Sequence, residues 1–101
     1  MTATPDAERG TPLRVRAEAA WRLSDSVSLR PEPFGALAYD FRTRRLSFLK
    51  TPTLVDVVRG LADHDTAGEA LTAAGVTPQQ ESSYLSALTT LAGSGLIEER
   101  P

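Results

Sequence analysis

The run from residue 27 to residue 50 constrains the fold most, because it has the period of β-strands while everything after it has the period of helices. Across residues 36–41, large apolar residues alternate with alanine and aspartate, a pattern typical of a half-buried strand. Residues 27–30 and 45–49 are predicted to form strands on either side, with a turn at residues 42–44. We expect Pro31, Glu32 and Pro33 to form a connector outside the sheet, since proline has no amide to donate.

Three helices are predicted after the strands, over residues 52–60, 66–75 and 78–93. Each begins at a threonine, a favoured N-cap, and the first and third have proline at the first helical position. The helix stops are Gly60, Gly75 and Gly93. The order of elements indicates an α+β fold: a three-stranded antiparallel β-meander followed by three helices, in a winged-helix-like arrangement.

The chain of 101 residues predicts one domain. Residues 2–14 have few apolar side chains and two prolines, so residues 1–20 are expected to be a flexible tail and the packed domain is predicted over residues 21–101. The absence of cysteine excludes disulfides and thiolate chemistry. No apolar run has the length of a signal peptide or a membrane span, so we expect a cytoplasmic protein without a membrane partner.

No arrangement of residues predicts catalysis, a metal or a cofactor. His64 is the only histidine and lies in a polar segment, where a solvated loop residue is the simpler interpretation. Glu32 has no second titrating group nearby to act with it, so we expect it to pair with Arg30 or with an arginine of the turn. The glycines match no phosphate-binding spacing. An enzyme is therefore not expected.

Charge divides the chain into two halves. Residues 1–50 carry nine Lys or Arg against six Asp or Glu, and residues 51–101 carry two against seven. Basic residues gather at the predicted turn, where they either keep the sheet edge soluble or guide an acidic ligand to it. The apolar arc of the third helix is wider than the usual stripe of about 100°. This arc is either fully packed in the core or lines a groove through Tyr84, Ala87 and Leu91.

A winged-helix protein that binds DNA or regulates transcription is the alternative hypothesis, with the last helix in the major groove and the basic hairpin on the backbone. From residue 78 to residue 95 there is no Lys or Arg, and Glu81 adds a negative charge. Because base readout and phosphate neutralisation depend on basic side chains, we expect no nucleic-acid partner.

Two segments resemble a known family. The runs L-R-P-E-P-F-G-A-L-A-Y-D-F (residues 29–41) and R-R-L-S-F-L-K (residues 44–50) are similar to the mycofactocin peptide chaperones of the MftB type, which are PqqD-like recognition elements for ribosomally made, modified peptides. The resemblance implies a domain without catalytic activity that binds the leader of a short precursor peptide. It further implies that the domain presents this peptide to a radical S-adenosylmethionine maturase in mycofactocin biosynthesis.

In this family the leader adds as an antiparallel strand to the third strand, beside the third helix. Carried onto this chain, the resemblance implies a peptide site on the strand and on one helix face; with the basic turn added, the candidate residues are Arg44, Arg45, Leu46, Ser47, Phe48, Leu49, Tyr84, Ala87, Leu88 and Leu91. Leu46 and Phe48 either contact the peptide or face the core and leave the site to the alternate side chains. An unoccupied strand edge also predicts that the unliganded chain is able to pair with itself as a homodimer.

Overall fold

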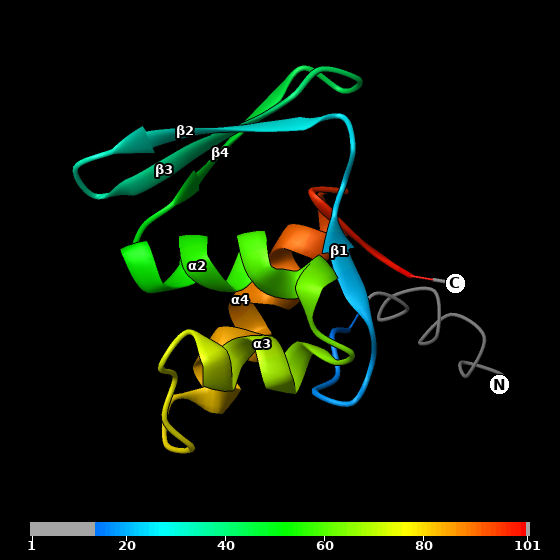
Figure 1. Cartoon of the computed structure of the whole chain (residues 1–101). Coiled ribbons are helices and arrows are strands. Elements are labelled where there is room, and N and C mark those ends of the chain that lie inside the picture. The colour runs from blue at the N-terminus through cyan, green and yellow to red at the C-terminus, as the bar shows by residue number, and fades with distance from the viewer. Residues whose placement is uncertain (1–13, 101) are drawn as a thin grey trace, which may run out of the picture.

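The computed structural model describes residues 14–100, which form two small sheets and three helices (Figure 1). The elements in chain order are β1 (Trp21–Leu23), β2 (Val27–Glu32), β3 (Gly35–Asp40), β4 (Arg45–Leu49), α2 (Pro52–Gly60), a 3-10 turn η1 (Leu61–Asp63), α3 (Ala67–Ala73), α4 (Glu81–Gly93) and β5 (Ile97–Glu99). The predicted α+β order, an antiparallel meander followed by three helices, is confirmed.

The meander has the strand order β2-β3-β4, with every neighbouring pair antiparallel. The expected connector at residues 31–33 is partly wrong: Pro31 and Glu32 continue β2 and lie opposite Ala36 and Gly35. Proline is tolerated here because β2 is an edge strand, where a nitrogen can face away from the ladder. The turn therefore begins only at Pro33.

A second sheet, which the sequence does not predict, pairs β1 with β5. Trp21 lies opposite Glu99 and Leu23 opposite Ile97, so the two ends of the described chain are held together. Arg22 and Glu98 form a half-exposed ion pair across this ladder (2.7 Å). In Figure 1 this two-stranded sheet stands beside the helices, apart from the meander.

The helix starts follow local chemistry. The Thr51 hydroxyl caps α2 by accepting a hydrogen bond from the amide of Leu54 (3.0 Å). The Thr66 hydroxyl caps α3 by accepting one from the amide of Glu69 (3.1 Å). The third helix begins later than predicted, at Glu81, because residues 78–80 form a turn instead of the first helical turn. No described helix within residues 14–100 is long and apolar enough to cross a membrane.

The core lies between the meander and the helices. α2 packs against β3 and β4, and the β3 side of this contact is built from small residues, since Ala36 and Ala38 are completely buried. Figure 1 shows the meander as a layer over α2, with the opposite face of the sheet turned away from the helices.

The segment before β1 also contacts the fold. Val15 is buried and its amide donates to Thr89 of α4 (3.0 Å), while the carbonyls of Ala17 and Ala19 accept amides from the first turn of α3. The packed contacts of the described chain thus begin before Trp21. Residues 1–13 of the expected tail lie outside the described residues.

Candidate functional site

The edge of β4 that faces away from β3 pairs with no strand within residues 14–100. The hydrogen bonds of the meander determine which backbone groups point to this edge. The amide of Phe41 donates to the carbonyl of Ser26 (2.9 Å), which marks these residues as a hydrogen-bonded pair. Because such pairs alternate along an antiparallel ladder, the N–H and C=O groups of Ala36, Ala38 and Asp40 point to β4.

In β4, the residues opposite Ala36, Ala38 and Asp40 are the alternate ones, Leu49, Ser47 and Arg45. Their backbone groups are therefore used within the meander. The N–H and C=O groups of Leu46 and Phe48 point instead to the open edge. Two donors and two acceptors are thus available to an added strand, which is the arrangement that strand addition requires.

The side chains of β4 alternate between the two faces of the sheet. Leu46 and Phe48 are each 55% exposed on the outer face, while Leu49 is completely buried under the sheet and Ser47 is half-buried. The sequence left open whether Leu46 and Phe48 face the core; the structure places them outside it. Leu49 is a core residue whose backbone groups pair with Ala36, so it supports the edge strand and offers a ligand neither its side chain nor its amide.

The predicted residues of α4 divide between core and surface. Leu88 is completely buried and Leu91 is 7% exposed, so both belong to the hydrophobic core. Tyr84 and Ala87 are half-buried. Tyr84 packs at the margin of the core. Of the predicted helical residues, Tyr84 and Ala87 are therefore the ones accessible to a ligand.

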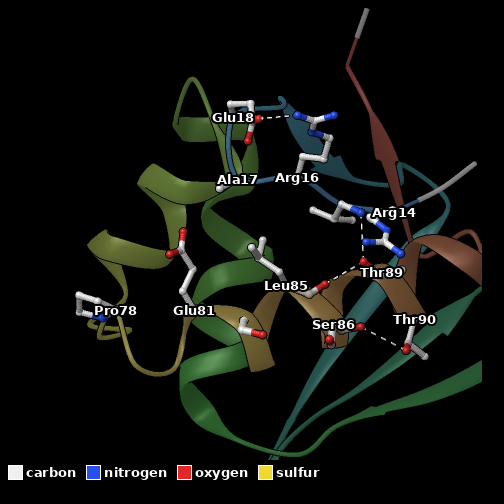
Figure 2. Close-up of a pocket in the computed structure, with 12 residues that line it drawn as sticks. Arg14, Arg16, Ala17, Glu18, Pro78, Glu81, Leu85, Ser86, Thr89 and Thr90 are labelled. Carbon is white, nitrogen blue, oxygen red and sulfur yellow. Dashed lines mark hydrogen bonds and ion pairs between the residues drawn. The ribbon is translucent and has the colours of Figure 1, made fainter. Parts of the chain in front are cut away.

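An open cavity of about 940 Å³ lies on another face of α4, between this helix and residues 14–18. Figure 2 shows its lining, in which the side chain of Leu85 lies between Glu81 and Thr89. The lining combines hydroxyl groups with apolar side chains, and Arg16 and Glu18 form an ion pair in it (2.8 Å). None of the predicted site residues lines this cavity.

The basic turn between β3 and β4 is held by a buried carboxylate. Asp40 is 1% exposed and accepts hydrogen bonds from the Ser26 hydroxyl (2.8 Å) and the Arg42 amide (2.9 Å). The hydrogen bond from Ser26 is the largest cause that lowers the pKa of Asp40 below its ordinary value. Arg44 has a left-handed backbone (φ 64°) and its amide donates to the carbonyl of Asp40 (2.7 Å). This geometry leaves Arg42 and Arg44 exposed in the turn before β4, and Arg45 exposed as the first residue of β4.

The outer face of the meander carries a cluster of large apolar side chains, of which the sequence predicts only Leu46 and Phe48 as site residues. Its members, called the outer patch below, are Phe34 (41% exposed), Tyr39 (38%), Phe41 (61%), Leu46 and Phe48 (55% each), with the half-buried Leu37 between them. Phe34 contacts Phe48 (ring centroids 6.0 Å apart), and Tyr39 contacts Phe41 (5.6 Å). The one sequence signal for this patch is size: the alanines of β3 alternate with its large residues, and a closely packed helix requires the small ones.

The residues weighed for catalysis do not assemble. Within residues 14–100, no group of three or more His, Cys, Asp or Glu side chains is placed to hold a metal ion. Glu32 pairs with Arg30 (3.1 Å), as the sequence predicts. His64 accepts a hydrogen bond from Arg100 through its backbone carbonyl.

The open strand edge, the basic turn and the exposed apolar face define a class of protein: a small module that binds another polypeptide. A family model, the peptide chaperone MftB family, matches residues 20–98. The chain belongs to this family, so the predicted resemblance is confirmed. Members are peptide chaperones, which confirms the expected non-catalytic role.

Curated relatives agree with the family match. The chain is 54% identical over 80 residues to the peptide chaperone MftB of Mycolicibacterium smegmatis, covering 79% of this chain and 78% of that protein. It is 52% identical over 80 residues to the protein of the same name from Mycobacterium ulcerans, covering 79% of this chain and 73% of the relative. It is 44% identical over 100 residues to that of Mycobacterium tuberculosis, covering 99% and 92%. No solved structure matches the chain.

Proposed function

We propose that this peptide chaperone binds the leader of a short ribosomal precursor peptide as an added strand on β4, and presents the peptide to a radical S-adenosylmethionine maturase in mycofactocin biosynthesis. The observation that carries the binding mode is the direction of the Leu46 and Phe48 backbone groups, which point to the open edge of the meander. An extended peptide laid antiparallel to β4 satisfies these groups and gains affinity from main-chain hydrogen bonds.

Side chains of the added strand then alternate between the two faces of the sheet. Those on the inner face point toward the helices, where Tyr84 and Ala87 are the accessible predicted residues of α4. Those on the outer face stand beside Leu46 and Phe48, which are more than half exposed. We therefore expect a leader whose apolar residues recur at alternate positions.

The positive charge at the start of β4 favours an acidic leader. Arg44 and Arg45 are exposed at the start of β4, so acidic residues between the apolar ones favour encounter with this edge. Long-range attraction of this kind raises the association rate more than the final affinity. The DNA-binding alternative gains no support, since α4 contains no Lys or Arg and begins at Glu81.

Holding the leader explains how a chaperone without catalytic groups assists a reaction. While the leader occupies β4, the C-terminal part of the precursor is tethered near any enzyme bound to the same chaperone. The tether raises the effective concentration of that segment without any new contact to it. Two surfaces are then required, one for the leader and one for the maturase.

Isothermal titration of the full chain tests the proposal, with a synthetic mycofactocin-type precursor and its leaderless C-terminal fragment as ligands. We expect heat and 1:1 binding with the precursor and none with the fragment. A precursor whose leader is scrambled is the matched control, because it keeps length and charge. Equal binding of all three peptides, or of none of them by a folded chain, contradicts leader recognition.

A further inference from the structure

The outer patch has no role in the fold. Its side chains point away from the helices, whereas the inner face of the same strands supplies the buried Ala36, Ala38 and Leu49. A solvated face of an antiparallel sheet is usually polar. Here the register instead places Leu37 opposite Phe48 and Tyr39 opposite Leu46, so the apolar surface is continuous across two strands. Contiguous apolar surface of this kind is typical of an interaction site.

The rim of the outer patch is basic in balance. Basic side chains lie beside the patch, and the acidic side chain on this face, Glu32, is already paired with Arg30. Arg30 lies on this face opposite Leu37, and the exposed Arg44 and Lys50 flank the two ends of β4, whereas Arg45 lies opposite Asp40 on the inner face. Aromatic residues together with arginine are the composition of protein-binding hot spots. The occupant that fits is a protein surface with an apolar centre and an acidic rim.

A second copy of this chain fits the patch poorly. A two-fold dimer places the same surface on both sides, so two basic rims would face each other. Like charges brought together across an interface disfavour the pairing. Charge therefore favours a different protein as the occupant.

We propose that the outer patch docks the maturase, and that the leader completes the docking surface. This inference rests on the proposed function. A leader strand on β4 lies directly beside Leu46 and Phe48, so its outward side chains extend the patch by one strand. The enzyme then contacts chaperone and leader together, and distinguishes the loaded chaperone from the empty one. Linkage requires the reciprocal effect: the enzyme tightens leader binding by the same factor.

The test changes the patch away from β4, so that the leader edge stays intact. In the variant Tyr39→Thr/Phe41→Glu, threonine is a β-branched residue that favours strands and glutamate opposes the expected acidic rim. Ala73→Glu, an exposed position on α3, is the matched control for the added charge. Affinity for the purified maturase is measured with and without the precursor, and affinity for the precursor is measured separately.

We expect the patch variant to bind precursor as the wild type does and to lose maturase affinity by at least about tenfold, with Ala73→Glu unchanged. We also expect precursor to raise the maturase affinity of the wild-type chain. Unchanged maturase affinity in the patch variant overturns the inference. So does a variant that loses only self-association in sedimentation or only binding to anionic vesicles, because the patch is then a dimer or membrane surface.

The two proposals fail in different ways. If the wild-type chain binds no precursor, the proposal of leader recognition is wrong. The maturase affinities measured without precursor still test the outer patch. If precursor binds normally and the patch variant keeps full maturase affinity, only the docking inference fails. Circular dichroism establishes that each variant is folded; should the double variant unfold, Phe41→Gln alone makes the same test at a turn position that is 61% exposed.

Discussion

Pro31 lies directly opposite Ala36 in the β2–β3 ladder, at a position whose backbone nitrogen points to the outer edge of β2. The alternation that directs the Phe41 amide to Ser26 places Ser28, Arg30 and Glu32 in the hydrogen-bonded pairs and Pro31 between them. The missing proline amide therefore costs the sheet no hydrogen bond. The same geometry at the opposite edge of the meander identifies where a proline would affect a ligand instead of the fold.

Phe48→Pro tests strand addition, because Phe48 occupies in β4 the kind of position that Pro31 occupies in β2. We expect this variant to stay folded and to lose precursor affinity by at least about tenfold, since a backbone donor at the open edge is gone. Phe48→Ala separates the loss of the amide from the loss of the ring. Titration with the precursor and urea unfolding are the measurements.

Ser47→Pro is the matched control, one residue away. The amide of Ser47 belongs to the ladder with β3, opposite Ala38, so its removal leaves a buried acceptor unsatisfied. We expect the free energy of unfolding to fall by about 1–3 kcal/mol, more than in Phe48→Pro. If Phe48→Pro binds precursor as tightly as the wild type, the leader does not add to this edge.

Gly35→Ala should destabilise the meander at its first turn. A Cβ at this position would lie 2.1 Å from the carbonyl oxygen of Leu49, so β3 and β4 must separate to admit it. We expect the free energy of unfolding to fall by more than about 1 kcal/mol. Gly93→Ala is the contrast, because a Cβ there meets nothing within 4 Å and α4 gains a helix-favouring residue. That variant should be unchanged or more stable, by up to about 1 kcal/mol, and equal effects of the two substitutions in urea unfolding would contradict this account.

Arg44→Asn/Arg45→Gln should slow the association of an acidic leader and leave dissociation nearly unchanged. Asparagine is chosen because it tolerates the left-handed backbone that Arg44 adopts. Stopped-flow mixing should show an association rate that falls with ionic strength in the wild type and is nearly flat in the variant. Arg59→Gln, an exposed charge on α2, serves as the control. A wild-type rate independent of salt would exclude guidance by the turn.

The features that the sequence predicts correctly depend on interactions between residues close together in the chain. Thr51 and Thr66 are N-caps because a hydroxyl near the first free amides stabilises a helix start wherever the helix lies. The strands of the meander were predictable for the same reason, since alternation and turn residues act over short distances. The features that were missed depend on partners far along the chain. Trp21 pairs with Glu99 in strands of three residues, which are too short to show a pattern.

The sequence predicts where the candidate site lies, but not which of its side chains are exposed to a ligand. Nothing local distinguishes an edge strand from a central one, so Pro31 was assigned to a connector. Which face of β3 is buried is decided by the close approach of α2, which accepts Ala38 and excludes the larger Tyr39. The same packing leaves the aromatic side chains of the outer patch to solvent, and the burial of Leu91 in the core is likewise a tertiary effect.

Asp40→Asn should lower the free energy of unfolding, because it removes the carboxylate that holds the basic turn. It should also make this free energy depend less on pH. The native carboxylate accepts hydrogen bonds from Ser26 and from the Arg42 amide, and its pKa is lowered, with the Ser26 bond as the largest cause. A lowered folded-state pKa contributes stability that is fully present above the unfolded value of about 3.9 and is lost as pH falls through the folded value. Urea unfolding from pH 7 down through pH 3 should therefore show a fall in stability for the wild type that is smaller in Asp40→Asn. Ser26→Ala should raise the pKa of Asp40 toward its ordinary value, measurable by NMR titration of the carboxyl carbon, and an unchanged pKa in that variant would contradict the assigned cause.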